Sequence, residues 1–478
     1  MEDILEYVVQ LALKEGATYA EARYQADRSE SILLKNGLPE VTSFDTKRGI
    51  GIRIIAKGGL AFSATNLLNK GTLSTMVKRA VRSAVASRWL RKGGVRLSEA
   101  DIVSGRFETK QRIGFGNVPM ELRAELLKEA DDLAIEAGRM NRVSVPGRFL
   151  SLDTWETEKT IITSDGGHVT TSVPRVAFTA FITAAVDGNG SEQRIIQLGE
   201  SGGWECAERW DLPLRIKEEV GTLAMVLQRS KHLPAERMDV ILGPEVVGIV
   251  SHESCGHPGE ADRLLGREAA QAGDTFLTRS SLGSKAASGV VNVVDDPTLP
   301  RSFGYYACDD ECVKARRRFL IKEGRFSEFL QDRETAADLD VRSNGSSRSV
   351  AYNREPIVRM ANTFVQQGDH RFEELVEGVK RGVYIKNYTE WNIDDRRYNQ
   401  RYVGLEAYLI ESGQIRHAVR NPLLEVTTPA LWSSIDAVGK DLEFSAAYCG
   451  KGDPMQGIPV WAGGPHIRLR NMHVGGGA

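Results

Sequence analysis

The stretch His252-Glu253-Ser254-Cys255-Gly256-His257 places a carboxylate directly beside the first of two imidazoles, in the pattern H-E-x-x-x-H. Neutral imidazole is the commonest metal ligand among side chains. A glutamate next to a metal-activated water can act as a general base. The familiar metallopeptidase pattern, H-E-x-x-H, has one residue fewer between its histidines. The stretch therefore predicts a hydrolytic metal site, provided that the additional residue can be accommodated.

The residues upstream predict a helix that carries this pattern. Gly243 precedes Pro244, a residue that suits the first position of a helix, and Glu245 follows in the first turn. The helix dipole favours an acidic side chain in that turn. His252 and Glu253 therefore belong near the C-terminal end of an apolar, buried helix.

The spacing of the two histidines requires an irregular helix. Residues five apart on a regular helix differ by about 140° around its axis, so two such ligands cannot share a face. Gly256 permits an unusual φ, and Pro258 disfavours the helical conformation at the residue before it. We expect a π-type turn, or a helix end at Gly256, to bring His257 back toward His252.

A catalytic zinc site needs three protein ligands and an open position. The third ligand could be Cys255, Cys308, Cys312, Cys449, His466, Glu260 or Asp262. Cys255 is too close along the chain to reach the same metal, and Cys308 with Cys312 fits plain core thiols better than a second site. Cys449 precedes a Gly-Lys-Gly loop, in which Lys451 would favour the thiolate. From chemistry alone, Cys449 is equally well explained as an ordinary buried cysteine.

Length and composition indicate a globular protein of two domains. At 478 residues the chain exceeds one ordinary hydrophobic core. Hydrophobic residues make up 41% and charged residues 26%, which are globular values without a sign of disorder. The net charge of -2 gives no general attraction to nucleic acid or to an anionic membrane, so neither is an expected partner.

The pattern of helices and strands divides the chain into two expected domains. We expect helices over 4–16, 73–89, 121–137 and 212–228, and strands within 21–66 and over 149–155, 160–163 and 176–186. The polar stretch 229–234 marks the boundary, so the N-terminal domain is 1–235 and the C-terminal domain 236–478. The C-terminal domain opens with a strand at 238–242 and the metal helix, followed from about residue 290 by short β-like runs. No nucleotide-binding glycine motif is present.

The sequence also predicts a cytoplasmic location. The N-terminal segment is an amphipathic helix with acidic residues at its start, so we expect no signal peptide. No run of about 18 apolar residues predicts a membrane span. Five cysteines, an odd number in a chain of this size, indicate reduced thiols.

Several motifs, in order and over nearly the full length, make the chain resemble the TldD/PmbA family of metallopeptidases, in its motif-bearing TldD-type branch. These motifs are the glycine-rich segment 49–66, H-E-S-C-G-H at 252–257, V-D-D-P-T at 294–298, D-D-E at 309–311, L-I-K-E-G at 320–324, R-M-A-N-T at 359–363, C-G-K-G at 449–452 and V-G-G at 474–476. The family usually has Gly where this chain has Cys312, and no proline at the position of Pro258. Neither departure removes a ligand.

The resemblance implies an α+β protein with an N-terminal helix and antiparallel-sheet domain and a β-rich C-terminal domain that carries the metal helix. It implies that His252, His257 and Cys449 bind one zinc ion per metal-bearing subunit, with Glu253 as general base. The implied activity is hydrolysis of short or unfolded peptides. The implied assembly is a homodimer, or a heterodimer with a motif-less relative.

Other roles remain to be compared with this one. Arg359 and Asn362 could hold the backbone or carboxylate of a peptide, although buried structural hydrogen bonding is the commoner role of such side chains. A non-enzymatic, metal-stabilised peptide-binding or assembly protein would use zinc to close a structural site, with a fourth ligand such as His466. A role in DNA topology has only the basic run within 314–325 in its favour, and the net charge opposes it.

Overall fold

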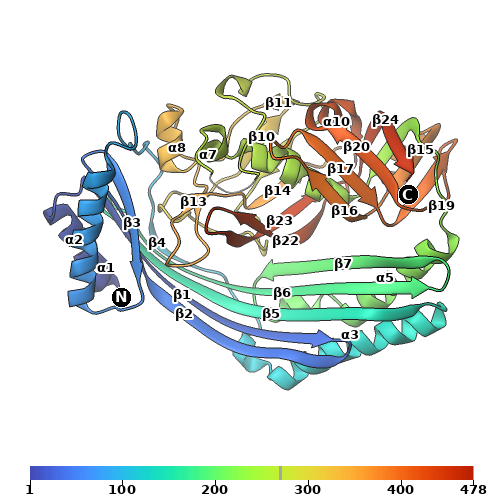
Figure 1. The fold of residues 1–478 in the computed structure, drawn as a ribbon, viewed down its shortest axis with the longest axis horizontal. Coiled ribbons are helices and arrows are strands. Elements are labelled where there is room, and N and C mark those ends of the chain that lie inside the picture. Colours follow the sequence, from blue (N-terminus) through green and yellow to red (C-terminus); the bar gives the residue numbers. More distant parts are fainter. Residues whose placement is uncertain (269–271, 477–478) are drawn as a thin grey trace.

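The protein, described by a computed structural model over residues 1–268 and 272–476, has a long curved sheet on one side and a β-rich half on the other. Figure 1 shows the C-terminal strands lying over one face of the long sheet, with α3 (Met120–Met140) against its other face. This is the α+β arrangement that the sequence predicts, with an N-terminal helix and antiparallel-sheet half and a β-rich C-terminal half.

The N-terminal half contains one seven-stranded sheet. Its strands are β1 (Tyr19–Lys35), β2 (Leu38–Ala56), β3 (Gly59–Thr65), β4 (Ser104–Glu108), β5 (Ser144–Thr163), β6 (His168–Val186) and β7 (Gly190–Ser201). The order is β3-β2-β1-β5-β6, and β4 and β7 share the remaining edge of β6. The predicted strands 149–155 and 160–163 are parts of one strand, β5, which pairs along its length with β1 and β6.

The predicted N-terminal helices are all present and cover the sheet with their apolar faces. Their bounds are α1 (Glu2–Lys14), α2 (Lys70–Ser87), α3 and α5 (Leu212–Arg229), with a short α4 (Glu205–Glu208) and a 3-10 turn at Phe115–Asn117. One apolar core joins α1 and α2 to β1 and β2, and a second joins α3 and α5 to β5, β6 and β7. Both cores follow from burial of an apolar helix stripe against an apolar sheet face.

The C-terminal half contains two larger sheets and one small one. The nine-stranded sheet consists of β8 (Glu236–Leu242), β15 (Arg381–Ile385), β16 (Tyr388–Ile393), β17 (Asn399–Gly404), β18 (Ala407–Glu411), β19 (Gln414–Val419), β20 (Pro422–Thr427), β21 (Ile435–Val438) and β24 (Ile467–Gly476). The six-stranded sheet consists of β9 (Val293–Asp295), β10 (Arg318–Lys322), β11 (Arg325–Phe326), β14 (Asn362–Val365), β22 (Glu443–Lys451) and β23 (Gln456–Gly464), and the two-stranded sheet of β12 (Ser347–Arg348) and β13 (Ile357–Val358).

The C-terminal helices are short, and α6 (Pro244–Ser251) is the one that positions the site. The others are α7 (Ala261–Leu264), α8 (Arg333–Asp338), α9 (Phe372–Glu377) and α10 (Thr428–Ser434), with a 3-10 turn at Arg279–Ser281. Val246, Val247 and Val250 of α6 are buried in the core that includes Val460 of β23. Gly248 lets α6 approach β23 closely, because a Cβ there would lie 3.0 Å from the carbonyl oxygen of Ala462. Among the described residues, no helix is both long enough and apolar enough to cross a membrane.

Candidate metal centre

The helix that carries H-E-x-x-x-H contains the predicted irregularity. α6 continues directly into a π-helical turn over His252–Gly256 and then a 3-10 turn over His257–Gly259. A π turn takes up one more residue than an α turn, so the extra residue of the motif is absorbed there. The imidazole rings of His252 and His257 consequently lie edge to face, with 4.8 Å between their centroids.

Gly256 and Pro258 act differently from the expectation. Gly256 has an ordinary right-handed conformation, with φ -60° and ψ -64°, so an unusual φ is not its purpose. Its missing side chain is what matters, because a Cβ there would lie 2.0 Å from Sδ of the buried Met360. His257 is also right-handed helical, with φ -58° and ψ -46°. Pro258 thus starts the 3-10 turn instead of forcing its predecessor out of the helix.

Three side chains converge at this point. Ligand atoms of His252, His257 and Cys449 all lie within 4.8 Å of one another, and all three residues are buried. Nε2 of His257 lies 3.5 Å from Sγ of Cys449. Two ligands of a tetrahedral zinc ion, with bonds of about 2.0 Å to nitrogen and 2.3 Å to sulfur, would be separated by about 3.5 Å. The spacing therefore fits a metal ion between them.

His252 has the properties of an available ligand. Its Nδ1 is buried and has no hydrogen-bond partner among the described residues. Burial lowers the pKa of His252 more than the nearby carboxylates of Glu253 and Glu260 raise it, so the ring is neutral at pH 7. A neutral imidazole with an unsatisfied buried nitrogen is what a metal ion would complete.

His257 is oriented by Glu260, three residues later on the chain. Nδ1 of His257 lies 2.9 Å from Oε2 of Glu260, which leaves Nε2 facing Cys449. Nε of Arg263 donates to the same carboxylate oxygen at 2.7 Å, and the ammonium of Lys451 lies 3.3 Å from it. Burial alone would raise the pKa of Glu260. Lys451, His257 and Arg263 nevertheless hold this pKa well below its usual value. A carboxylate behind a histidine in this way fixes the ring and its tautomer for metal binding.

Cys449 comes from β22, far along the chain from the histidines. Arg359 donates to the carbonyl oxygens of Cys449 and, at 2.8 Å, of Gln456, so it joins β22 to β23. Against the effect of burial, His257 and Arg359 lower the pKa of Cys449 to about 7, which favours the thiolate that a metal binds.

Lys451 does not play the part that the sequence suggested. Its ammonium donates to Oδ1 of Asp262 at 2.7 Å and to the carbonyl of Val358 at 2.8 Å. The side chains that lower the thiol pKa of Cys449 are His257 and Arg359. Lys451 instead compensates the acidic charge of Glu260 and Asp262 behind the histidine.

Glu253 is buried beside His252 and forms an ion pair with Arg397. Arg397 lies in the loop between β16 and β17, and its Nη2 also donates to the carbonyl of Ala272 at 3.4 Å. No sequence pattern marks Arg397, because it is 144 residues away and belongs to an ordinary polar turn. Glu260, by contrast, has a detectable signal, since it lies one helical turn after His257.

The remaining ligand candidates have other partners. Cys255 packs in the core with Met360, while Cys308 and Cys312 pack with Ile161 and Val169. His466 contacts the hydroxyl of Tyr384 at 2.9 Å and the carboxylate of Asp441, and it is not among the residues that converge on the site. The structure therefore brings no fourth His or Cys ligand to the three within the described residues.

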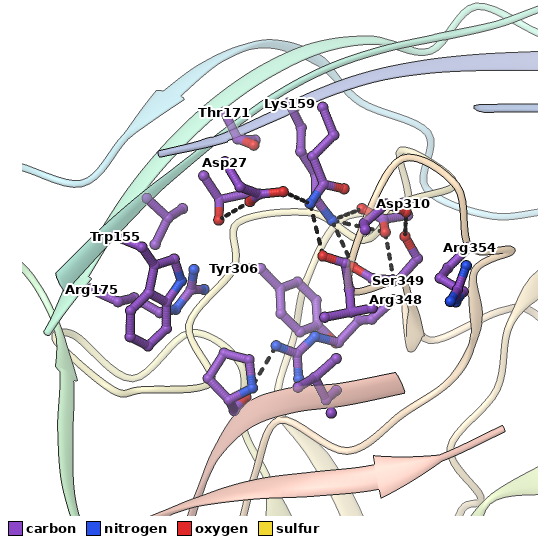
Figure 2. A pocket seen from close by; sticks show the side chains of 18 of the residues that line it. Asp27, Trp155, Lys159, Thr171, Arg175, Tyr306, Asp310, Arg348, Ser349 and Arg354 are labelled. Atoms are coloured by element: carbon purple, nitrogen blue, oxygen red, sulfur yellow. Dashed lines mark hydrogen bonds and ion pairs between the residues drawn. The ribbon is translucent and has the colours of Figure 1, made fainter. Parts of the chain in front are cut away.

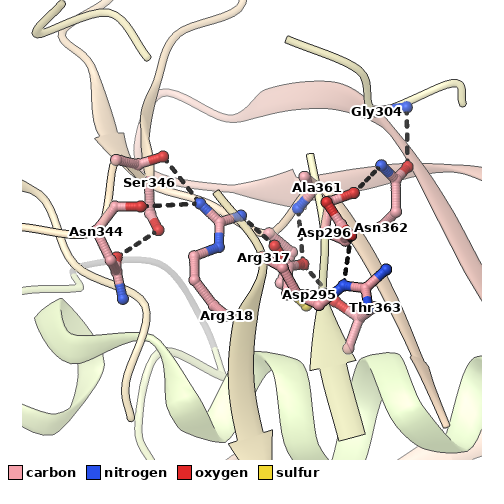
Figure 3. A network of polar contacts seen from close by, with 12 residues as sticks. Asp295, Asp296, Gly304, Arg317, Arg318, Asn344, Ser346, Ala361, Asn362 and Thr363 are labelled. Carbon is pink, nitrogen blue, oxygen red and sulfur yellow. Dashed lines mark hydrogen bonds and ion pairs between the residues drawn. The ribbon is translucent and has the colours of Figure 1, made fainter. Parts of the chain in front are cut away.

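Arg359 and Asn362 make their hydrogen bonds within the protein. Both are fully buried, and Asn362 donates to Ser302 Oγ at 2.9 Å and accepts from the backbone N–H of Gly304 and of Trp461. Figure 3 shows Asn362 of β14 beside Asp296, the residue that follows β9. These contacts fit the structural role that the sequence left open for both residues.

Three arginines of the basic run within 314–325 form ion pairs. Arg318 is buried against Asp295, as Figure 3 shows, and Arg317 pairs with Asp296 at 2.7 Å. Arg316 pairs with Glu328, also at 2.7 Å. Among the described residues of the run, Lys314, Lys322 and Arg325 are the exposed cations without an ion pair, which is a weaker basic surface than the stripes that bind nucleic acid.

Models of known families match most of the chain. A model described as the PmbA/TldA metallopeptidase C-terminal domain matches residues 235–476, and those of domain 1 and the central domain of the same family match 20–84 and 113–228. The chain is similar to a metalloprotease of Methanothermobacter thermautotrophicus, with 30% identity over 97% of each chain. It is also similar to a zinc metalloprotease TldD homolog of Saccharolobus solfataricus, with 34% identity over 50% of this chain and 51% of the relative.

Solved structures share the fold. A protein of Bacteroides thetaiotaomicron, named as a candidate modulator of DNA gyrase, matches 99% of this chain and 98% of its own with a TM-score of 0.76. The sequence identity is 17%, so this likeness concerns the fold alone.

Proposed function

The chain belongs to the PmbA/TldD family of metallopeptidases, and on that premise we propose that it hydrolyses short or unfolded peptides at a metal held by His252, His257 and Cys449. The observation that carries the proposal is the convergence of three buried ligand atoms within 4.8 Å, from a distorted helix and a distant strand. A site with three protein ligands leaves a position open for water and substrate, which is typical of catalytic metal centres.

The metal that we propose is zinc. Two neutral imidazoles and a thiolate suit it, and the same ligand types also accept cobalt or iron. When bound, zinc would activate a water molecule and polarise the scissile carbonyl. His257 would keep its orientation through Glu260, and Arg359 would hold the strand that presents Cys449.

Glu253 is the proposed general base. It follows His252 directly, and its carboxylate is close enough to raise the pKa of the His252 ring against the effect of burial. It would take a proton from the attacking water and return it to the nitrogen of the leaving amine. Arg397 would position this carboxylate through their buried ion pair.

A peptide could bind by adding a strand to an exposed edge. β22, which carries Cys449, stands at the end of the strand order of its sheet. Main-chain hydrogen bonds to such an edge accept many sequences, because they do not involve the side chains of the peptide. This geometry supports short or unfolded peptides as substrates.

A second candidate function is a metal-stabilised protein that binds peptides or assembles without catalysis. The observation in its favour is that Glu253 is already paired with Arg397 and that Glu253, His252 and His257 are at most 5% exposed. Such a protein would have no need of Glu253 as a base, so substitution of this residue separates the two functions.

The deciding experiment compares Glu253→Gln with Glu245→Gln. Both glutamates lie on the same helical segment and pair with an arginine, Arg397 and Arg194 respectively. We expect Glu253→Gln to keep its metal, measured by mass spectrometry, and to lose at least about 100-fold in kcat/KM for an unfolded peptide. Glu245→Gln should stay close to wild type. A Glu253→Gln protein with full metal and unchanged hydrolysis would exclude the mechanism.

The assembly and the compartment are part of the same proposal. We propose a dimer, with a second copy or with a motif-less relative, and a cytoplasmic location. All five cysteines are free and buried, which supports a reducing compartment. The ion pairs of the basic run and the net charge of -2 support the absence of a nucleic-acid partner.

A further inference from the structure

A cavity of about 620 Å³ lies between the two halves of the molecule, away from the ligand set. Its walls are strands β1, β5 and β6 on one side, and the segment 305–310, β12 and the β22–β23 hairpin on the other, as Figure 2 shows in part. Successive residues of a strand point to opposite faces. Tyr448 of β22 lines the cavity, whereas its neighbour Cys449 faces the histidines.

Three arginines line this cavity, and two of them, one from each half of the protein, are buried in its wall. The third, Arg354, donates to the carbonyl oxygen of Asn353 at 3.1 Å. Arg175 on β6 donates to the carbonyl oxygens of Phe303 at 3.0 Å and Tyr305 at 2.9 Å. Arg348 on β12 donates to the carbonyl oxygens of Met360 at 2.6 Å and Pro459 at 3.2 Å.

Neither guanidinium forms an ion pair with a carboxylate among the described residues, although both are buried. Arg175 is 7% and Arg348 8% exposed. Burial, reinforced by the repulsion from Arg348, lowers the pKa of Arg175 to about 9, and burial lowers that of Arg348 to about 10. Both remain protonated at neutral pH, so the cavity holds two poorly solvated positive charges. Buried charges are normally compensated, and an anion in the cavity would supply that compensation.

The lysines and carboxylates of the cavity have partners of their own. Lys159 donates to both carboxylate oxygens of Asp310, at 2.7 and 2.9 Å, and Lys47 pairs with Asp45. Asp27 accepts from the hydroxyl of Thr157 at 2.8 Å and from Gln25, and burial raises its pKa. It acts on Arg175 only through its electric field, which offsets part of the lowering of the pKa of Arg175. The remaining carboxylates are Asp153, which accepts from Ser151 at 3.0 Å, and Asp309, whose pKa burial and Glu311 raise well above the usual value.

An aromatic wall stands beside the two guanidiniums. Trp155 on β5 is the direct cross-strand neighbour of Arg175, and its ring lies 6.3 Å from that of Tyr448. Tyr448 is 46% exposed. Aromatic faces next to a cationic group suit a ligand that joins an apolar body to an anionic end.

We propose that this cavity is a second binding site, separate from the metal centre, for a small carboxylate that bears an apolar or aromatic group. The carboxylate would lie between Arg175 and Arg348, whose planar guanidinium groups match its geometry. The apolar group would pack on Trp155 and Tyr448. This chemistry is that of a free amino acid or a peptide C-terminus with a large side chain, and the site would exist whether or not the metal centre hydrolyses peptides.

The test uses N-acetyl-phenylalanine and its neutral amide as probes, in isothermal titration calorimetry with the full-length, metal-loaded protein. The acid should bind at least tenfold more tightly than the amide. Arg348→Gln should abolish this difference, whereas Arg175→Lys, which keeps the charge, should retain part of it. Arg342→Gln, an exposed arginine paired with Asp101, serves as the matched control and should bind like wild type.

His252→Ala separates the two sites, because it disrupts the ligand set without touching the cavity wall. The acid should bind to this variant with unchanged affinity, and its loss would assign the carboxylate to the metal centre and overturn the proposal. Equal binding of acid and amide, no binding of either probe, or an acid preference that survives Arg348→Gln would also overturn it. Thermal melting of each variant confirms that it is folded before titration.

Discussion

Glu253 and Arg397 form a buried ion pair next to His252, and this ion pair fixes the position of the carboxylate that we propose as general base. Its side chains are 6% and 10% exposed, so neither charge is well solvated. Nη2 of Arg397 extends the contact to the carbonyl of Ala272. The position of the Glu253 carboxylate therefore depends on a residue 144 positions away in the chain.

Arg397→Ala should lower the free energy of unfolding by about 3–5 kcal/mol, because it leaves the Glu253 carboxylate buried without its partner. The double variant Glu253→Gln/Arg397→Ala removes that charge as well and should recover part of the loss. Chemical denaturation of the wild type, both single variants and the double variant measures the coupling. Additive effects of the two substitutions would contradict it.

The sequence identified the chemical groups of this site better than their environment. His252, Glu253 and His257 are adjacent, so one motif predicts all three. Cys449 could be chosen only through the family resemblance, because no local pattern connects a strand residue with a helix almost two hundred residues earlier. Arg397 and the contact of Arg359 with Cys449 could not be predicted for the same reason, since a single buried arginine contact leaves no periodicity in the sequence.

The π-helical turn after α6 is the element on which the ligand set depends. Gly256 contributes space to this turn, since its Cα faces Sδ of the buried Met360. Gly259, three residues later, faces open surroundings, and a Cβ there would meet only Leu320 at 3.9 Å. The two glycines thus form a natural pair for comparison.

Gly256→Ala should cost about 1–3 kcal/mol of stability, because the added methyl group overpacks against Met360. Displacement of His257 should also weaken metal binding by at least about tenfold, measured by competition with a chelator. Gly259→Ala should leave both quantities close to wild type. Equal behaviour of the two variants would show that space at Gly256 does not matter.

The turn also shows where sequence reasoning about elements succeeds and where it fails. The spacing of the histidines demanded an irregular turn, and Pro244 fixed the helix start, so both were predictable. The need for glycine at position 256 was not predictable for the right reason, because the close packing of Gly256 against Met360 joins residues more than one hundred positions apart. In the same way β5 looks like two strands in the sequence, whereas pairing with β1 and β6 makes it continuous.

Across the whole molecule, charged side chains connect the long sheet to the C-terminal half. Arg53 of β2 pairs with Glu21 of β1 at 3.0 Å and with Glu311 of the C-terminal half. Glu355 lies near this group, and the positive charge of Arg53 lowers the pKa of Glu355 by less than burial raises it. Burial, with help from Glu334, raises its pKa to about 7.

Glu355→Gln should stabilise the protein at pH 8 by about 1–3 kcal/mol and have no effect near pH 4. The folded-state pKa of Glu355, about 7, lies above its unfolded value of about 4.3, so the folded state keeps the proton that the unfolded state releases. The wild type therefore loses stability as the pH rises through this window, and the glutamine variant does not. Denaturant unfolding at pH 4.5, 6 and 8 measures the difference, with the exposed Glu425→Gln as control.

The proposed dimer can be tested at the tip of the β1–β2 hairpin. Leu38 and Phe44 are each 69% exposed there, and Val41 is 43% exposed. If a second chain covers this apolar tip, Phe44→Asp should shift the protein to monomers in sedimentation velocity. Ile415→Asp, at an apolar position on β19 that is 41% exposed, should leave the dimer intact. A dimer that is unchanged by Phe44→Asp would place the interface elsewhere.

Because Tyr448 and Cys449 point to opposite faces of β22, this one strand contributes a side chain to both the cavity and the candidate metal site. A slip of β22 by a single residue would turn the thiol into the cavity and the phenol toward the histidines, so both sites would fail together. Arg359 disfavours this slip, because its guanidinium donates hydrogen bonds to the carbonyl oxygens of Cys449 on β22 and Gln456 on β23. Correct alignment of β22 with β23 during folding is thus a condition for metal binding, and the hydrogen bonds of Arg359 favour that alignment.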